Sequence, residues 1–465
     1  ARPPLPHQIS SERETDMSKR FDVVILGAGN AGMGAAGALR AAGKTVAMIE
    51  SWDVGGTCPL RGCVPKKVLV AAAQVLHQIE RAAVHHIDVG PARLDWAKLI
   101  ERERGFVDGV PEAFEESLAS RGIEVIKGRA RFVGRNAVEV NGERVEAGKI
   151  VIATGSKPRP LPIPGAEHLI TSEDILERTE LPESLIFIGG GVIALEFSHV
   201  YARAGTKVTI LEALPRLLPR TEADAVAQIH KESERIGIDI LTGVKIQEIA
   251  PVDGGLEVRF EHEGEVKTLA AKAVANGTGR VPDLDGLDLD AGEIEHDGTR
   301  IAVDETLASI SNPDVYVAGD VLTGSAQLSP IATYEGRIVA HNILDGTPKT
   351  PEYGHIPANV YTVPALASVG LTEAEAAEKG LDVTVKANDL GTWRSSATHA
   401  ESVAYSKVLI ENGSGRILGA HIVGHGGEEI IHIFALAMQH GLTADDLANT
   451  VYGYPTFASD IKNML

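Results

Sequence analysis

Short apolar runs are separated by glycine-rich turns and alanine-rich segments in the first part of the chain. Residues 21–26 (FDVVIL) predict a buried strand, and residues 33–42 predict a helix. The turn between them contains three spaced glycines, Gly27, Gly29 and Gly32. A second predicted strand over residues 45–49 ends at Glu50, so this segment predicts a strand–helix–strand unit.

The same arrangement occurs again from residue 184. Strands are predicted over residues 184–188 and 207–211, with a helix between them and Glu212 at the end. The turn before this helix consists of glycines, Gly189, Gly190 and Gly191. Glycines let backbone N–H groups approach a pyrophosphate, and an acid about 20 residues later can bind ribose hydroxyls. One such turn also fits an ordinary loop, but two complete units predict two bound dinucleotides.

The remaining apolar runs predict how the chain is divided. Residues 150–155 (IVIATG) and 315–320 (VYVAGD) predict buried strands, and residues 157–165 and 275–282 predict connections into and out of an inserted domain. From about residue 353 the pattern changes to mixed strands and helices, the helices over 372–379 and 428–440. We expect a disordered extension (1–16), a first dinucleotide domain (17–157 and 284–350), an inserted second one (158–283) and a C-terminal domain (351–465).

Length and composition narrow the class of protein. A chain of 465 residues is too long for one hydrophobic core, and its 44% hydrophobic and 23% charged residues are ordinary for a globular protein. The net charge of −20 argues against nucleic acid and anionic membranes as partners. No apolar run approaches the ~20 residues that span a bilayer. Residues 1–16 lack the apolar stretch of a secretory signal, so we expect a cytoplasmic protein.

The two cysteines lie close together, in residues 55–67 (GGTCPLRGCVPKK), before an apolar helical run over 68–79. Cys63 is therefore expected at a helix entrance, where backbone N–H groups and the helix dipole stabilise a thiolate. Lys66 and Lys67 add positive charge, and Cys58 is near enough to form a disulfide with Cys63. Two inert, buried cysteines would not account for these lysines or for the preceding dinucleotide motif.

These motifs resemble those of the class I pyridine nucleotide–disulfide oxidoreductases, which include glutathione reductase, lipoamide dehydrogenase and mercuric reductase. The resemblance covers about residues 20–465. It implies an α/β fold with two Rossmann-like domains, the NAD(P) domain inserted in the FAD domain, and an α+β C-terminal dimerisation domain that completes each active site across a homodimer. Electrons would pass from a nicotinamide through FAD to the Cys58–Cys63 disulfide and then to a small disulfide-type acceptor.

The resemblance also implies roles for individual residues. Lys66 and Glu196 would pair beside the flavin, Asp320 would bind its ribityl chain, and Leu328 would begin a helix that points at the ring. The catalytic set would be Cys58, Cys63, Lys66, Glu196 and Tyr454. The cofactor-binding set would be Gly27, Gly29, Gly32, Glu50, Gly56, Thr57, Lys67, Thr154, Gly155, Gly189, Gly191, Glu212, Gly279, Arg280, Asp320 and Leu328.

Glu212 favours NADH, because an acid at the end of this strand accepts a hydrogen bond from the adenosine 2′-hydroxyl and repels a 2′-phosphate. Arg216 and Arg220 follow closely and keep NADPH as an alternative. We therefore expect NADH to be the preferred electron donor.

The C-terminal segment departs from the family pattern. Tyr454 and Ser459 stand where glutathione and lipoamide enzymes carry an acid–base His–Glu pair. A Tyr with an ordinary pKa of about 10 is a poor proton shuttle. The family's two glutathione-binding arginines are replaced by Gly37 and Asn342, and the terminal cysteines of mercuric reductases are absent. A reductase of quinones, metal ions or metalloid species, or a lipoamide-dehydrogenase-like subunit of a larger complex, remain alternatives.

Overall fold

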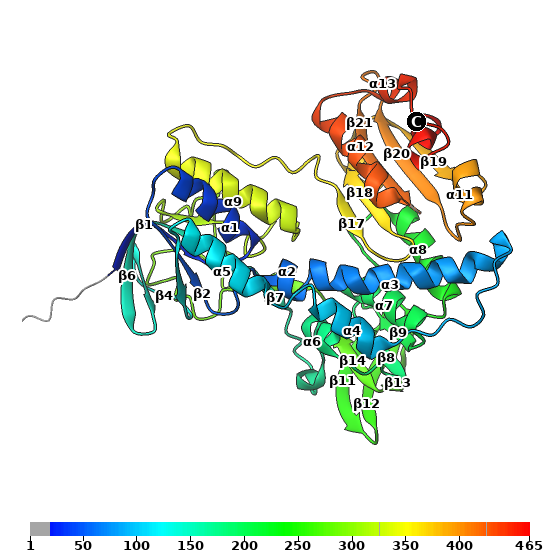
Figure 1. Cartoon of the computed structure of the whole chain (residues 1–465), viewed down its shortest axis with the longest axis horizontal. Coiled ribbons are helices and arrows are strands. Elements are labelled where there is room, and N and C mark those ends of the chain that lie inside the picture. Colours follow the sequence, from blue (N-terminus) through cyan, green and yellow to red (C-terminus); the bar gives the residue numbers. More distant parts are fainter. Residues whose placement is uncertain (1–18, 325, 425) are drawn as a thin grey trace, which may run out of the picture.

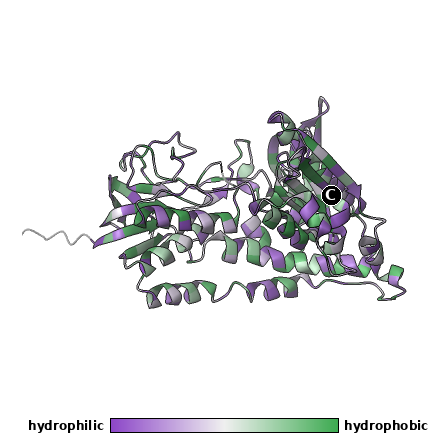
Figure 2. Cartoon of the chain, turned by 90° about the horizontal axis from the view of Figure 1, so that it is seen from above, coloured by the Kyte–Doolittle hydropathy of each residue, from purple (hydrophilic) through white to green (hydrophobic). Residues whose placement is uncertain are grey.

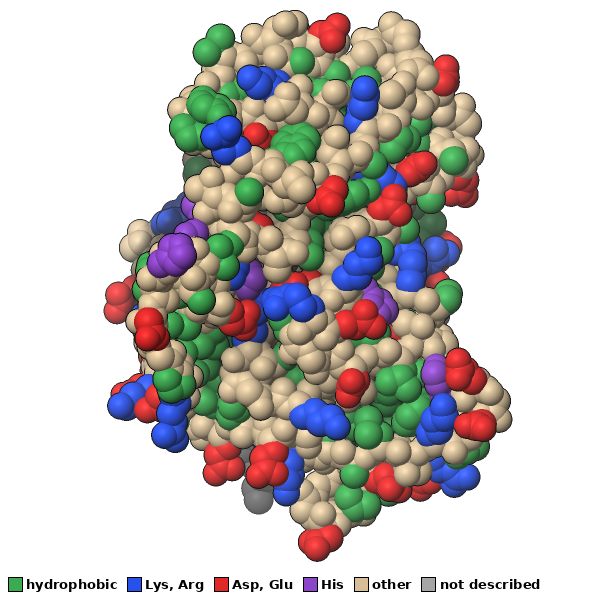
Figure 3. Space-filling view, turned by 90° about the vertical axis from the view of Figure 1, so that its right-hand side faces the viewer, with side chains coloured by type: hydrophobic (Ala, Val, Ile, Leu, Met, Phe, Trp, Pro, Cys, Tyr) green, Lys and Arg blue, Asp and Glu red, His purple; other side chains and the backbone are tan. Residues whose placement is uncertain are grey.

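The computed structural model describes residues 19–324, 326–424 and 426–465 (Figure 1). The predicted extension, residues 1–16, lies outside the described residues. Within the described ranges, no helix is long and apolar enough to cross a membrane. Figure 3 shows basic and acidic side chains interspersed on one face of the molecule.

The first dinucleotide unit belongs to a seven-stranded sheet. Its strands follow the order β3-β2-β1-β6-β5-β4, and β16 pairs with β6. Strands β1, β2, β3, β6 and β16 are parallel to one another, whereas β5 pairs antiparallel with β6 and β4 antiparallel with β5. The strand bounds are β1 Lys19–Leu26, β2 Val46–Glu50, β3 Glu124–Lys127, β4 Arg131–Gly134, β5 Ala137–Val140, β6 Glu143–Ile152 and β16 Val315–Val317.

Helices α1 (Asn30–Ala41) and α9 (Ser329–Leu344) lie side by side next to this sheet (Figure 1). They approach closely because two glycines face the neighbouring backbone. A Cβ on Gly336 would lie 2.1 Å from the Ala31 carbonyl oxygen, and one on Gly34 would lie 2.6 Å from the Thr333 carbonyl oxygen. This contact fixes the positions of the two helix starts relative to one another.

The second unit forms a parallel sheet in the order β10-β9-β8-β14, next to an antiparallel sheet in the order β11-β12-β13. The connections before and after it pair with each other as β7 and β15. The bounds are β7 Ser156–Pro158, β8 Ser184–Ile188, β9 Lys207–Leu211, β10 Asp239–Leu241, β11 Lys245–Val252, β12 Gly255–His262, β13 Glu265–Ala271, β14 Ala273–Asn276, β15 Arg280–Pro282, α6 Ser172–Glu177, α7 Val192–Ala204 and α8 Ala223–Arg235.

A five-stranded sheet in the order β17-β18-β21-β20-β19 forms the C-terminal part, which contains both hydrophobic and hydrophilic stretches (Figure 2). The two helices predicted here appear as α10 and α12, and further short helices accompany them. The bounds are β17 Ala358–Val360, β18 Leu366–Gly370, β19 Val383–Asp389, β20 Tyr405–Glu411, β21 Ile417–Val423, α10 Glu373–Glu378, α11 Arg394–Thr398, α12 Gly427–Gln439, α13 Ala444–Asn449 and α14 Ile461–Met464.

The long helix α3 (Cys63–Arg81) connects these parts (Figure 1). It begins at Cys63, which confirms the predicted helix entrance, and Pro65 is tolerated in its first turn. Its buried face, with Leu69 and Val70, shares one hydrophobic core with α7 and with the C-terminal sheet. The remaining helices are α2 Thr57–Arg61, α4 Trp96–Arg104 and α5 Val110–Ser120, with 3₁₀ turns at Ala82–His85, Ala166–His168 and Phe457–Asp460.

Candidate active site

The two cysteines lie together where α2 meets α3. Cys58 is in the short helix α2, Cys63 is the first residue of α3, and Gly62 turns the chain between the helices. A Cβ on Gly62 would lie 2.9 Å from the Thr57 carbonyl oxygen, so this turn needs glycine. Both thiols are free, Cys63 is exposed, and the two side chains form a hydrogen bond with each other.

This hydrogen bond makes the two thiols chemically different. Donation from Cys58 lowers the pKa of Cys63 to about 6, against partial desolvation of the sulfur, and Ser329 and Lys66 act in the same direction. The same hydrogen bond, together with burial, raises the pKa of Cys58. At neutral pH the reduced pair therefore carries one proton, and the thiolate is on Cys63.

Two polar residues that the sequence analysis did not assign as site residues act on the pair. The Ser329 hydroxyl oxygen lies 3.4 Å from the Cys63 sulfur, the Asn30 amide donates to the Ser329 carbonyl oxygen at 3.5 Å, and both residues act to lower the pKa of Cys58. They are the first residues of α9 and α1. A polar residue at a helix start is a frequent capping feature, so the sequence alone did not distinguish these two.

Lys66, about one turn along α3 from Cys63, forms a nearly buried ion pair with Glu196. The Lys66 ammonium lies 2.8 Å from Glu196 Oε2, and the two side chains are 13% and 6% exposed. The backbone N–H of Tyr361 donates to Glu196 Oε1 at 2.8 Å. The Tyr361 ring lies under both lysines, with its centroid 4.4 Å from the Lys66 nitrogen and 3.5 Å from the Lys67 nitrogen. Sequence reasoning missed Tyr361, which follows β17.

The first glycine turn has the geometry that a dinucleotide pyrophosphate requires. Gly27 has a φ of +110°, and a Cβ there would lie 2.3 Å from the Ala153 carbonyl oxygen. A Cβ on Gly32 would lie 2.1 Å from the Gly27 carbonyl oxygen, and one on Gly56 would lie 2.6 Å from Gly29 Cα. Only glycines fit this backbone cradle at the start of α1, so these residues fit an FAD pyrophosphate.

Glu50 and Glu212 occupy equivalent places in the two units. Glu50 accepts hydrogen bonds from the N–H groups of Ala28, at 2.7 Å, and Trp52, at 2.9 Å. Glu212 accepts them from Gly190 and, at 2.7 Å, from Leu214. Each acid thus binds the glycine turn of its own unit. In this position it can accept hydrogen bonds from the ribose hydroxyls of a dinucleotide. The second turn also needs its glycines, since Gly189 has a φ of +95°.

Five of the predicted cofactor-binding residues lie close to the place where β7 and β15 pair. They are Thr154, Gly155, Gly279, Arg280 and Asp320. The Ser156 hydroxyl donates to Asp320 at 3.2 Å and accepts from Arg280 at 2.9 Å. Burial raises the pKa of Asp320 and lowers that of Arg280. Thr154 donates to the Asp283 carbonyl oxygen, the Gly155 carbonyl accepts from Asp283, and the Gly279 carbonyl accepts from Arg159. Leu328 immediately precedes α9.

Tyr454 is separate from these groups. Its side chain is 70% exposed, and among the described residues no hydrogen bond joins it to Cys58 or Cys63. Ser459 is buried and closes a local turn, donating from its hydroxyl to the Thr456 carbonyl oxygen at 2.6 Å. Within one chain, neither residue supplies an acid or base to the cysteine pair.

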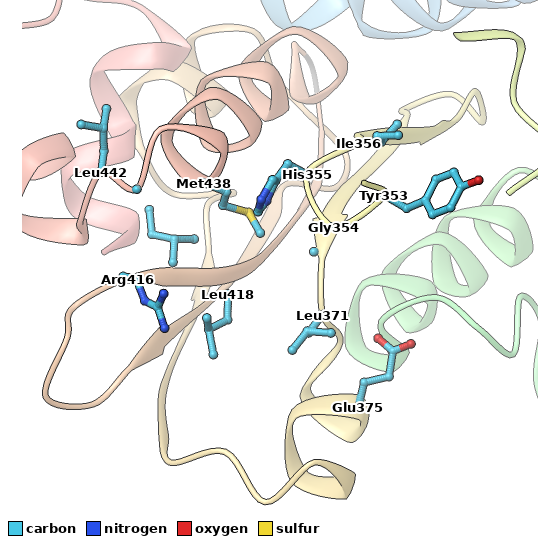
Figure 4. Close-up of a pocket in the computed structure, with 13 residues that line it drawn as sticks. Tyr353, Gly354, His355, Ile356, Leu371, Glu375, Arg416, Leu418, Met438 and Leu442 are labelled. Atoms are coloured by element: carbon cyan, nitrogen blue, oxygen red, sulfur yellow. The ribbon is translucent and has the colours of Figure 1, made fainter. Parts of the chain in front are cut away.

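A cavity of about 390 Å³ lies elsewhere, in the C-terminal part. Figure 4 shows Leu371, Leu418 and Met438 at this cavity, with Glu375 and Arg416 beside them. The Arg416 guanidinium pairs with Glu411 at 2.8 Å, and the Glu375 carboxylate accepts the Thr372 N–H at 2.9 Å. These charges are satisfied within the protein, and the residues that line the cavity include none of the predicted site residues.

The fold, the paired cysteines and the two glycine turns define a flavin- and nicotinamide-dependent oxidoreductase, and the chain belongs to the pyridine nucleotide–disulphide oxidoreductase family. The family model matches residues 21–336, and the model of its dimerisation domain matches residues 356–465. This result confirms the resemblance and the fold class predicted from the motifs.

Individual relatives cover nearly the whole chain. The dihydrolipoyl dehydrogenase of Chlorobaculum parvum is 32% identical over 97% of each chain. The mercuric reductase of Bacillus cereus is 32% identical over 98% of this chain and 73% of its own. The Cu(II) complex of RclA, an HOCl-induced flavoprotein disulfide reductase from Escherichia coli, superposes with a TM-score of 0.86 at 29% identity, over 96% of this chain and 99% of that one.

The chain is thus an FAD-dependent NAD(P)H oxidoreductase of the flavoprotein disulfide reductase class. Its matched dimerisation domain supports a homodimer.

Proposed function

We propose that this enzyme takes electrons from NADH and reduces a small disulfide through Cys58 and Cys63. The observation that carries the proposal is the place of the two cysteines at the junction of α2 and α3, with the Ser329 hydroxyl 3.4 Å from Cys63 and the Lys66–Glu196 ion pair one turn further along α3. Their surroundings lower the pKa of Cys63 and raise that of Cys58. An acidic, exposed Cys63 and a less acidic Cys58 suit two different tasks, holding a thiolate and attacking an acceptor.

The residues of this chain would each have a separate role in the reaction. Bound FAD supplies the two-electron chemistry that links the nicotinamide to the cysteine pair. The first glycine turn and Glu50 would hold its pyrophosphate and ribose, and Asp320 its ribityl chain. Lys66, neutralised by Glu196, would keep a positive charge close to Cys63. Cys58 would attack the acceptor to form a mixed disulfide, which Cys63 would then resolve.

Two contacts support NADH as the donor. The Glu212 carboxylate is held by the N–H groups of Gly190 and Leu214, which keeps it at the ribose position. The Arg216 guanidinium donates to the backbone carbonyls of Leu218, at 3.0 Å, and Thr221, at 3.1 Å. Because these carbonyls already engage Arg216, it is poorly placed to bind a 2′-phosphate.

We further propose that each active site is completed across the homodimer. Three apolar or aromatic side chains of the C-terminal part stand open to solvent in the single chain, Leu436 at 56%, Tyr454 at 70% and Val451 at 96% exposure. Large exposed side chains of this kind mark interaction surfaces when they cluster. The exposed Tyr454 would reach the cysteine pair of the partner rather than that of its own chain.

A second candidate function is reduction of a metal ion. The observation that favours it is the lack of an acid–base pair at Tyr454 and Ser459, because a metal-ion acceptor has no leaving thiolate to protonate. Two of the similar proteins point the same way, one named mercuric reductase and one solved as a Cu(II) complex. In this reading, the metal ion is the substrate.

Turnover assays with matched variants separate these functions. We expect purified enzyme to reduce at least one of lipoamide, cystine and glutathione disulfide, and Cys58→Ser to abolish that activity. Oxidation of NADH by Cu(II) that survives Cys58→Ser, together with negligible turnover of every disulfide, would support the second candidate and overturn the first.

The same assays test the nicotinamide. We expect kcat/KM for NADH to exceed that for NADPH by at least about tenfold, the effect of one hydrogen bond to a charged group. Glu212→Ala should reduce this ratio, whereas Arg259→Ala, at an exposed position of β12, should leave it unchanged. A preference of the native enzyme for NADPH would contradict the assignment.

A further inference from the structure

Helix α9 carries a fully buried carboxylate, that of Glu335, which the proposed reaction does not use. Glu335 Oε2 accepts a hydrogen bond from the backbone N–H of Gly319 at 2.7 Å, and Oε1 accepts one from the Tyr353 hydroxyl, also at 2.7 Å. Burial and this hydrogen bond raise the pKa of Tyr353, so its hydroxyl stays protonated and donates. Each carboxylate oxygen thus has a donor, as a buried carboxylate requires.

The N–H of Gly319 belongs to the turn that leads from β16 to Asp320. Gly319 has a φ of +81°, and a Cβ there would lie 2.8 Å from Ala31 Cβ, so this turn passes close to the start of α1. Asp320 is the residue that we propose binds the ribityl chain of FAD. Because Glu335 holds the N–H of the preceding residue, it fixes the backbone from which the Asp320 side chain projects.

The Tyr353 hydroxyl comes from the connection between α9 and β17, which leads into the C-terminal part (Figure 1). Two further hydrogen bonds join this connection to α9. The Asn342 amide donates to the Lys349 carbonyl oxygen at 2.9 Å, and the Tyr334 hydroxyl accepts the Glu352 N–H at 3.0 Å. The connection therefore lies along α9, and Tyr353 brings it into contact with the buried carboxylate.

We propose that Glu335 and Tyr353 are positioning residues for FAD, which hold Asp320 in the place where it binds the cofactor. The proposal rests on the proposed role of Asp320 and adds two residues that act through the backbone at Gly319. A binding side chain must be held to within about 0.5 Å of its productive position, which requires supporting hydrogen bonds. Without the Tyr353 hydroxyl, Glu335 Oε1 loses a donor, so the carboxylate and the backbone that it holds are fixed less firmly.

The rate at which holoenzyme releases FAD tests this role without any turnover. Full-length holoenzyme is diluted, and free FAD in the ultrafiltrate is followed with time. We expect Tyr353→Phe to release FAD about tenfold faster than the wild type, the effect of losing one hydrogen bond to a charged group. Tyr334→Phe is the matched control, because it removes a neighbouring hydroxyl whose partner is the Glu352 N–H. Its release rate should stay within about twofold of the wild type.

A double variant shows whether Tyr353 acts through Glu335. Glu335→Gln keeps a side chain of the same size that can hydrogen-bond both partners, but it removes the charge. In this background, Tyr353→Phe should accelerate FAD release less than it does in the wild type, because the two residues share one contact. Independent, multiplicative effects of the two substitutions would overturn the proposal. Equal acceleration by Tyr334→Phe and Tyr353→Phe would also overturn it, because the effect would then belong to the connection as a whole.

Two further measurements separate this proposal from its alternatives. Thermal unfolding is measured for each variant, and a lower midpoint for Tyr353→Phe without faster FAD release would mean a structural role only. Asp320→Asn alters the binding side chain itself and should release FAD at least as fast as Tyr353→Phe. Fast release by Asp320→Asn with wild-type release by Tyr353→Phe would overturn the positioning role and leave that of Asp320 standing. Wild-type release by Asp320→Asn would overturn the proposed role of Asp320, and the positioning role with it.

Discussion

The Lys66 ammonium lies 2.8 Å from the Glu196 carboxylate, and this ion pair joins the helix that carries Cys63 to the helix of the second dinucleotide unit. Both charges act on the Cys63 thiol but in opposite directions, since Lys66 lowers its pKa and Glu196 raises it. The acidity of Cys63 therefore depends on a contact between two parts of the chain that are far apart in sequence.

Substitutions in this pair should move the pKa of Cys63 in opposite directions. Lys66→Met removes a positive charge and is expected to raise this pKa by roughly one unit, whereas Glu196→Gln removes a negative charge and should lower it. The pH dependence of Cys63 alkylation in reduced protein measures both shifts. Shifts of the same sign in the two variants would contradict this electrostatic account.

Reduced protein should also lose stability in acid because of Cys63. Its folded-state pKa of about 6 lies below the ordinary value, so ionisation of Cys63 favours the folded state. This contribution is complete above roughly pH 8.5, the pKa of a free cysteine, and is lost as the pH falls towards 6. Urea unfolding of reduced wild-type protein and of Cys63→Ser across this range should show the loss in the wild type only.

Tyr361 should act through its ring rather than its hydroxyl. Its centroid lies 3.5 Å from the Lys67 nitrogen and 4.4 Å from the Lys66 nitrogen. Tyr361→Phe keeps the ring and is expected to retain wild-type stability within about 0.5 kcal/mol. Tyr361→Leu should cost about 1–2 kcal/mol through the lost cation–π contacts, and it should raise the pKa of Cys63 because Lys66 is held less firmly. Urea unfolding compares the variants, and equal losses for Phe and Leu would exclude a role of the ring.

Lys407 is expected to hold the inserted unit against the C-terminal sheet. Its nitrogen, on a side chain only 2% exposed, lies 2.9 Å from Glu222, 2.5 Å from Asp224 and 2.6 Å from Glu373. Burial opposes ionisation of Glu222, but hydrogen bonds from the Glu373 N–H and Lys407 keep its pKa below the ordinary value. These three carboxylates could together bind a cation, and the ammonium of Lys407 already lies among them.

Removal of this ammonium should therefore destabilise the protein. We expect Lys407→Met to lower the free energy of unfolding by about 3 kcal/mol, because Glu222 would remain buried without its counter-charge. Lys386→Met, at an exposed position on the neighbouring strand β19, is the control and should change it little. Similar unfolding midpoints in urea for both variants would mean that the cluster contributes no net stability.

The fold and the glycine turns could be predicted from the sequence because their signals are local. Gly27 and Gly189 stand directly after apolar strands, and both have the positive φ that such turns require. Glu50 and Glu212 follow at the expected spacing. Each of these features depends on a short stretch of residues, so hydrophobic periodicity and residue spacing predict it.

The missed contacts depend on residues that only the folded chain brings together. Asn30 meets Ser329 across 299 positions of sequence, and Tyr361 meets Glu196 across 165. No periodic pattern links positions so far apart. The helix entrance predicted at Cys63 is confirmed, although apolar periodicity marks only the packed part of α3 and not its first turn.

The most direct test of the central claim is a thiol count after reduction by the natural donor. Oxidised holoenzyme is mixed anaerobically with one equivalent of NADH, labelled with iodoacetamide and digested with trypsin. We predict that NADH makes Cys58 and Cys63 reactive together, with no label on either before reduction. The account would be contradicted if NADH is consumed but both cysteines remain unlabelled after the protein has been denatured and alkylated.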